Sequence, residues 1–231
     1  MIRFRYLAEY FILFFSMQIF ASLILGQLNG GVALNGFLSS FFIFAFFLMS
    51  LWYVKVRRLS FLFGKGPKWR DVCVAILAWC AAFPCIVLLE IAVRTILDGF
   101  GEFSFQEQVA VYQMKRLLAY PVMFSLFVFC VVFIVPFIEE LLFRGLLQGY
   151  LREKLSSKIA VLVTSLFFAG AHFAIKQRAG NVLILLSLFV FSLVLGVIYE
   201  KRRVLWTPIA LHGMFNAMSV VFILFEANRL S

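Results

Sequence analysis

Charge is scarce in this chain. Of its 231 residues only 14% are charged, whereas 64% are hydrophobic and 18% are aromatic. A water-soluble domain of this length has no core large enough for so many apolar side chains, and the excess would have to face water. The composition therefore excludes an ordinary water-soluble domain, and the lipid bilayer is the solvent that fits it.

Acidic residues are even scarcer than basic ones, so that the net charge is +10. Nucleic-acid-binding proteins can carry such an excess, but they gather it along one face or one helix. Here the Lys and Arg residues form short clusters between apolar runs, as in the loops of membrane proteins. No nucleic-acid partner is expected.

Cysteine is also rare. The four cysteines, Cys73, Cys80, Cys85 and Cys130, lie in apolar segments, and the chain has no CxxC and no HExxH motif. This pattern gives no sign of a disulfide framework or of a zinc cluster. We expect all four to be small buried hydrophobic residues.

Long apolar runs, in contrast, are abundant. A membrane-spanning helix needs about 20 mostly apolar residues. Candidates lie at 8–27, 32–54, 71–93, 117–150, 159–178, 182–199 and 204–225. The first run is too long for a typical signal peptide and is expected to be retained. The predicted fold is all-α, a polytopic transmembrane helical bundle of about seven spans, or eight if the fourth segment breaks at Pro121 or Pro136.

The distribution of Lys and Arg predicts the orientation of these spans. Most basic residues flank the N-terminus and the connections after the second, fourth and sixth segments. Cytoplasmic loops are enriched in Lys and Arg. We therefore expect the N-terminus in the cytoplasm and the C-terminus outside.

Ionisable residues inside the spans are candidates for function, because a charge at the helix centre costs about 2.5–3.5 kcal/mol. Glu9 lies near a span end, and Glu90 precedes Arg94 by four residues, the spacing of an ion pair on one helix face. Both glutamates are expected to be structural. The only two histidines of the chain, His172 and His212, both lie in predicted spans, which together favours a functional site over two separate structural residues.

The segment PFIEELLFRG, residues 136–145, places two carboxylates and an arginine in apolar surroundings. Glu140 and Arg144 have the spacing of an ion pair, whereas Glu139 is rotated by about 100° and lacks that partner. Glu140 and Arg144 are therefore predicted to be supporting residues, and Glu139 to be a carboxylate that is free to accept a proton. The alternative, three charges that only hold helices together, leaves the histidines unexplained.

The candidate residues can form one site only if they lie at similar depths in the membrane. Glu139 meets the histidines only if the fourth helix continues to about Tyr150, which puts Glu139 roughly 16 Å from the inner end. His212 then lies about 12 Å from that end, and Asn216 about 18 Å. The helix is therefore expected to run on past Arg144, which the membrane then encloses.

Three short motifs hold these residues: EELLFR with Glu139, Glu140 and Arg144; FAGAH with Phe168 and His172; and HGMFN with His212 and Asn216. In order and spacing they resemble the EExxxR, FxxxH and HxxxN motifs of the CPBP family. This family comprises CAAX prenyl proteases and bacteriocin-processing proteins, intramembrane endopeptidases that are also called the Abi family. The resemblance covers about residues 117–225, the expected protease core. Residues 1–116 are expected to be an N-terminal transmembrane extension.

The resemblance implies hydrolysis of a peptide bond in a membrane-associated protein or peptide. Carried over by position, Glu139 and His172 would activate a water, with Glu139 as the general base. His212 and Asn216 would polarise the scissile carbonyl and hold the oxyanion, which needs donors already in place. Phe168 would pack beside His172.

Zinc is the open cofactor question, since members of this family are commonly described as metalloproteases. A zinc site would use Glu139, His172 and His212, with a water in the fourth position. Glu139 cannot readily be both ligand and base, so we favour a mechanism without metal.

Two functions of other classes stay open. Intramembrane Glu, His and Arg also form proton relays in ion-coupled transporters, although the chain shows no internal repeat. A non-catalytic membrane protein, such as an immunity or scaffold factor, would keep its function after Glu139→Gln. The expected location is the inner membrane of a bacterial cell.

Overall fold

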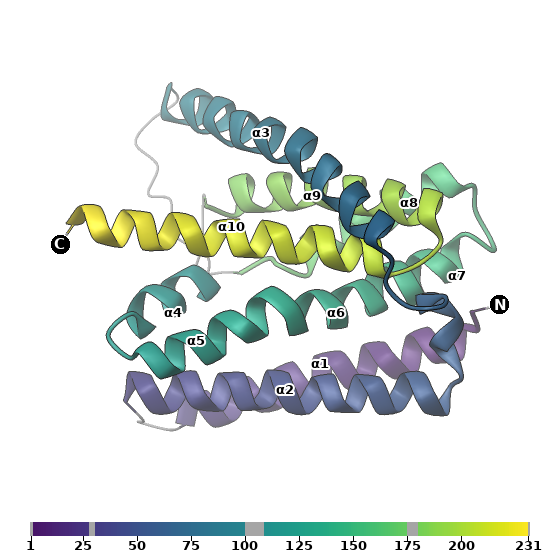
Figure 1. The fold of residues 1–231 in the computed structure, drawn as a ribbon, viewed down its shortest axis with the longest axis horizontal. Coiled ribbons are helices and arrows are strands. Elements are labelled where there is room, and N and C mark those ends of the chain that lie inside the picture. Colours follow the sequence, from purple (N-terminus) through teal and green to yellow (C-terminus); the bar gives the residue numbers. More distant parts are fainter. Residues whose placement is uncertain (1, 28–30, 100–108, 175–179, 231) are drawn as a thin grey trace.

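The computed structural model describes residues 2–27, 31–99, 109–174 and 180–230. Within these ranges every regular element is a helix. The helices lie side by side in a bundle, and the two chain ends lie at opposite ends of it (Figure 1). The predicted all-α bundle is confirmed.

Six helices of the described ranges are long and apolar enough to cross a membrane. They are α1 (Phe4–Gln27), α2 (Val32–Val56), α3 (Trp69–Gly99), a continuous rod from Pro121 to Leu151, α9 (Gly180–Arg202) and α10 (Trp206–Leu230). Each overlaps one predicted span, and most ends agree to within a few residues. The exceptions are helix ends that extend beyond the prediction, such as that of α3. The remaining predicted span, the fifth, forms the shorter apolar helix α8 (Ser157–Gly170).

The fifth predicted span, 159–178, is wrong in its second half. Helix α8 has 14 residues, about 21 Å at 1.5 Å per residue, which is short of the roughly 30 Å hydrocarbon core. The N–H of His172 donates to the carbonyl of Ala169 at 2.9 Å, a 3₁₀-type bond that closes the last turn. His172 therefore follows the helix rather than lying within it. Residues 175–178 lie outside the described residues.

The fourth predicted span forms one rod. Its parts are α5 (Pro121–Phe129), η2 (Cys130–Ile134), α6 (Val135–Glu140), η3 (Leu141–Gln148) and α7 (Gly149–Leu151). The segments η2 and η3 are π-helical. A turn separates the rod from α4 (Val109–Leu117), whose 9 residues are too few for an eighth span. The prediction that the helix continues to about Tyr150 is confirmed.

Pro136 accounts for the first π-helical turn. A proline nitrogen carries no hydrogen and cannot bond to the carbonyl one turn earlier. The N–H of Val135 donates instead to the carbonyl of Cys130, five residues back, which is the π-helical pattern. The rod is therefore widened, not broken, at Pro136.

Helix α10 docks where this turn leaves carbonyls without their usual partners. The side-chain amide of Asn216 donates to the carbonyl of Val131 at 2.8 Å. Gly213 passes so close to the rod that a Cβ atom there would lie 2.7 Å from the carbonyl oxygen of Val132. Only glycine permits this approach, which brings the third sequence motif against the first.

Asp71 fastens the helices α3, α9 and α10 together at one end. Its carboxylate accepts hydrogen bonds from Arg202 at 2.6 Å and from the hydroxyl of Thr207 at 2.9 Å. Asp71 itself is only 2% exposed. The sequence pattern did not indicate this cluster, which joins one end of three helices that also border a common cavity.

Glu9 is structural, as predicted. Its carboxylate accepts from Arg5 and Arg57, each at 2.6 Å, and from the hydroxyl of Tyr53 at 3.1 Å. Tyr53 and Arg57 belong to α2, so these contacts join the first two helices.

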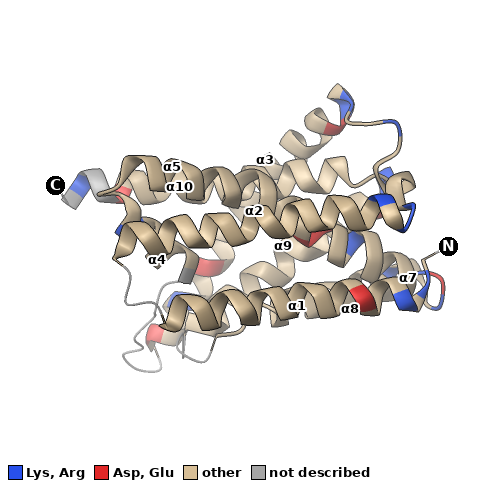
Figure 2. Cartoon of the chain, turned by 90° about the horizontal axis from the view of Figure 1, so that it is seen from below, with Lys and Arg blue, Asp and Glu red and all other residues tan. Residues whose placement is uncertain are grey.

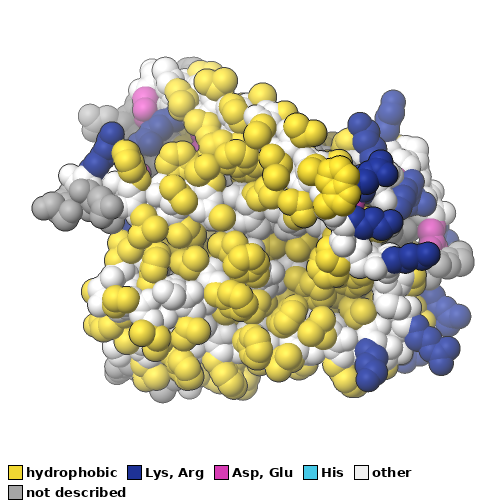
Figure 3. Space-filling model, viewed as in Figure 1, with side chains coloured by type: hydrophobic (Ala, Val, Ile, Leu, Met, Phe, Trp, Pro, Cys, Tyr) yellow, Lys and Arg dark blue, Asp and Glu magenta, His cyan; other side chains and the backbone are white. Residues whose placement is uncertain are grey.

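The flank of the bundle is apolar, and the basic residues lie at its ends. Large apolar side chains such as Trp52, Leu77 and Leu88 are exposed. Figure 3 shows hydrophobic side chains over the whole flank and most Lys and Arg at one end. The N-terminus and α7 lie at this basic end (Figure 2). This distribution matches a bundle that crosses a bilayer with one strongly basic face.

The prediction of four buried cysteines is wrong for three of them. Cys73, Cys80 and Cys85 are exposed along α3, and Cys130 alone of the four is buried. In a membrane the outward face of a helix is as apolar as the inward face. An apolar cysteine therefore gives no signal of which face it occupies.

Candidate active site

The rod carries the pair Glu140 and Arg144, which are both fully buried. The guanidinium Nη1 donates to Glu140 Oε1 at 3.0 Å, which confirms the predicted ion pair. Its Nη2 donates to the hydroxyl of Ser192 on α9 at 2.6 Å and to the Ser192 carbonyl at 3.2 Å. Ser192 is a partner that the sequence reasoning missed, because a single serine in an apolar run gives little signal.

Glu140 also holds His212, a contact that was not predicted. The same oxygen that pairs with Arg144 lies 2.8 Å from His212 Nδ1. Because a carboxylate accepts, Nδ1 carries the hydrogen of this bond. The other ring nitrogen, Nε2, then faces Glu139, whose Oε2 lies 3.8 Å away. Glu140 thus orients the histidine as well as balancing the arginine.

His172 approaches Glu139 from the other side. Its Nδ1 donates to the carbonyl of Phe168 at 2.8 Å, an acceptor that the end of helix α8 leaves without its usual backbone partner. Its Nε2 lies 3.9 Å from Glu139 Oε1. The early end of α8 therefore sets both the position and the orientation of this imidazole.

Glu139 consequently lies between two imidazole nitrogens. The distances of 3.8 Å and 3.9 Å exceed the length of a direct hydrogen bond, and they suit a water held between the groups. The side chain of Glu139 is 14% exposed and that of His172 is 32% exposed. The structure thus brings Glu139, His172 and His212 together, as the sequence predicted.

Asn181 fixes the segment that carries His172. Its side-chain carbonyl accepts from the N–H of Ala174 at 3.1 Å, and its amide donates to the carbonyl of Ala174 at 2.8 Å. Asn181 lies in the first turn of α9. These two bonds replace helical bonds that the segment lacks, and no pattern in the sequence indicated them.

Asn216 lies on the same helix face as His212, and it borders the same cavity. One hydrogen of its amide is used by the carbonyl of Val131. A side-chain amide has two such hydrogens, so one donor remains.

Phe168 is the common neighbour of the site residues. Its ring centroid lies 4.9 Å from that of His172 and 5.9 Å from that of His212. The Arg144 guanidinium lies 4.6 Å from the same ring, within the range of a cation–π interaction. The predicted packing beside His172 is confirmed, and the fully buried Phe168 ring contacts the arginine as well.

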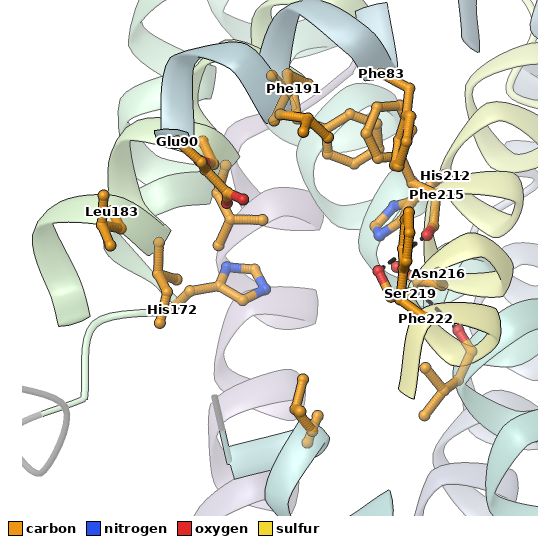
Figure 4. Close-up of a pocket in the computed structure, with 18 of the residues that line it drawn as sticks. Phe83, Glu90, His172, Leu183, Phe191, His212, Phe215, Asn216, Ser219 and Phe222 are labelled. Atoms are coloured by element: carbon orange, nitrogen blue, oxygen red, sulfur yellow. Dashed lines mark hydrogen bonds between the residues drawn. The ribbon is translucent and has the colours of Figure 1, made fainter. Parts of the chain in front are cut away.

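The site opens into a cavity of about 800 Å³ between α3, α4, α9, α10 and the rod. Glu139, His172, His212 and Asn216 all border it. Most of the other bordering side chains are apolar, such as Phe83, Phe191 and Phe222 (Figure 4). A cavity of this volume can hold a short stretch of peptide.

A metal site at Glu139, His172 and His212 was the alternative prediction. Among the described residues, which include all three, no group of three or more His, Cys, Asp and Glu side chains is placed to hold a metal ion. Zinc therefore stays a prediction for Glu139, His172 and His212, which would hold the ion if it binds there.

Comparison with known proteins bears on the same region. Residues 121–218 match the family model of the Rce1-like type II CAAX prenyl endopeptidases. Over this segment the chain is similar to the Rce1-like family. Comparison with curated proteins and with solved structures finds no significant match.

The Rce1-like segment contains every residue of the three motifs, and the resemblance stated from these motifs is confirmed. The family and the six membrane-length helices make the chain an integral membrane protein. The family is one of intramembrane CAAX-type endopeptidases, and its match marks the chain in general as a CAAX protease-like peptidase.

Proposed function

We propose that this chain hydrolyses a peptide bond of a membrane-associated protein or peptide with a water that Glu139 activates. The observation that supports this proposal is the position of Glu139. It borders a largely apolar cavity between two imidazole Nε2 atoms, at 3.8 Å and 3.9 Å. A carboxylate placed in this way can bind a water and take its proton.

The proposed reaction begins with a water held between Glu139 and His172 Nε2. Glu139 takes a proton from this water while its oxygen bonds to the scissile carbonyl carbon. The tetrahedral intermediate then collapses, the C–N bond breaks, and Glu139 passes the proton to the leaving amine. Glu139 thus returns to its starting state.

The oxyanion of the intermediate needs donors that are already in place. In this role His212 donates from Nε2 to the oxyanion, while its Nδ1 hydrogen stays bonded to Glu140 and holds the ring in place. Asn216 supplies the amide hydrogen that Val131 does not use. Both residues border the cavity, which is where the scissile carbonyl would lie.

Mutation of the three central residues tests the proposal. Glu139→Gln, His172→Ala and His212→Ala are each expected to cause uncleaved membrane-associated proteins to accumulate. Wild-type cleavage patterns in all three variants would contradict it. A functional phenotype that survives Glu139→Gln would favour a non-catalytic immunity or scaffold role instead.

The proposal needs no metal, and chelation tests that part. Activity is measured after exhaustive chelation, with the metal content determined on the same sample. Retained activity in metal-free protein supports the mechanism. Complete loss that zinc restores would contradict it.

We further propose that the chain lies in a bacterial inner membrane with its N-terminus in the cytoplasm. The basic end of the bundle, which holds the N-terminus, supports this orientation (Figure 2). A C-terminal alkaline phosphatase fusion is expected to be active, because the C-terminus would lie outside. Activity of only a cytoplasmic reporter at that end would contradict the orientation.

A further inference from the structure

The wall of the cavity that α3 forms carries a carboxylate outside the three motifs. Glu90 borders the same cavity as Glu139, His172 and His212. Its neighbours on α3 along this wall are the apolar residues Phe83, Ile86, Val87 and Ile91 and, one turn further on, Arg94. Figure 4 shows the Glu90 carboxylate extending toward the side of the cavity where His172 lies.

Glu90 differs from the other glutamates of the described residues in its lack of a partner. Glu9, Glu140 and Glu226 all form ion pairs. In the part of the chain that the structure describes, no hydrogen bond or ion pair involves Glu90. The predicted ion pair between Glu90 and Arg94 is therefore absent among the described residues.

A partnerless carboxylate in this position has a chemical consequence. The Glu90 side chain is exposed, but it borders a largely apolar cavity in a membrane-spanning bundle, and charges interact more strongly in apolar surroundings than in bulk water. A cation that enters gains a charge-assisted bond, and an anion is repelled. A site that attracts cationic groups and repels anionic ones discriminates between ligands by their charge.

We propose that Glu90 is a specificity-determining residue that binds a cationic group of the substrate. The group is a Lys or Arg side chain, or a free amino terminus, on the peptide that Glu139 cleaves. This inference rests on the proposed function, since it assumes that the cavity holds a peptide. Glu90 takes no part in activating the water.

The test uses the full chain in liposomes and a set of peptides. One series places a single Lys at each position around the cleavage site, and a matched series has the neutral norleucine there. Peptides with a free or an acetylated amino terminus distinguish the two sources of the cation. The proteins are the wild type, Glu90→Gln, Glu90→Lys and the control Asp98→Asn, which removes one charge from the exposed far end of α3.

The wild type is expected to cleave the Lys or free-amine peptide with a kcat/KM that is roughly tenfold or more above its neutral match. Glu90→Gln should abolish this preference and leave cleavage of the neutral peptide unchanged. Glu90→Lys should favour a Glu-containing peptide, and Asp98→Asn should behave as the wild type does. A preference that survives Glu90→Gln, or an equal loss for all peptides, would overturn the proposal.

Peptide binding to the Glu139→Gln protein separates this inference from the proposed function. One possible result is that peptides bind only when they carry the cation, that Glu90→Gln removes this binding, and that the wild type hydrolyses none of them. That result would refute the proposed hydrolysis and support the role of Glu90. Hydrolysis or binding without any dependence on the cation would refute the role of Glu90 alone.

Discussion

Two adjacent glutamates face two different regions of the bundle. On the closed side, Glu140 is fully buried with Arg144 and His212, and Ser192 holds the arginine from α9. On the open side, Glu139 faces the cavity and His172, and no direct hydrogen bond fills its position among the described residues. One step along a helix turns the side chain by about 100°. That turn separates a carboxylate that stabilises the fold from one that is available for chemistry.

His212 connects the two sides. Its Nδ1 belongs to the closed side and its Nε2 to the open side. A well-paired interior thus holds a reactive group in a fixed orientation. Changes on the closed side are therefore expected to act mainly on stability, and changes on the open side mainly on cleavage.

The largest expected effect on stability comes from Arg144→Met. It leaves Glu140 buried without its main counter-charge, which costs about 3–5 kcal/mol of unfolding free energy. The control Arg152→Met removes a partly exposed arginine that lies 3.9 Å from Glu200, and should cost about 0–1 kcal/mol. Unfolding of the purified proteins by denaturing detergent measures both. Equal losses would contradict the closed-side account.

Gly213→Ala should have the next largest effect. The new Cβ would meet the carbonyl of Val132 at 2.7 Å, and the helices must separate, at about 1–3 kcal/mol. Gly26→Ala is the matched control, because no atom lies within 4 Å of its added Cβ. The same unfolding assay applies. A variant as stable as the wild type would show that α10 does not depend on this close approach.

Asn181→Ala should have the smallest effect on stability, about 1 kcal/mol, because the partly exposed Ala174 groups can bond to water. Cleavage should fall more clearly, since the segment that carries His172 loses its attachment to α9. Measured kcat and unfolding free energy separate the two effects. A loss of stability without a loss of kcat would place Asn181 on the closed side.

The sequence predicted most of the fold because apolar run length is a direct signal in a membrane. It did not predict the early end of α8, since the segment around His172 is as apolar as the helix before it. The structure compensates for the missing helical bonds there with Asn181, which bonds the backbone of Ala174.

Helical spacing predicted the Glu140–Arg144 pair and the separate position of Glu139. Spacing describes neighbours on one helix, so it could not show that His212 and Ser192 complete the pair from other helices. The same rule gave the wrong result for Glu90, because the i, i+4 distance permits an ion pair but does not require one. The meeting of the three motifs was predicted from depth and from the family resemblance.

The most direct test compares Glu139→Gln with Glu140→Gln in one preparation, with cleavage rate and unfolding free energy measured on each. Glu139→Gln is expected to lower cleavage by a factor on the order of 10²–10⁴ with an unchanged unfolding free energy. Glu140→Gln is expected to lower the unfolding free energy by several kcal/mol, about the cost of breaking a buried pair. Wild-type cleavage by Glu139→Gln, or a loss of stability in that variant equal to the loss in Glu140→Gln, would contradict the division of roles between the two glutamates.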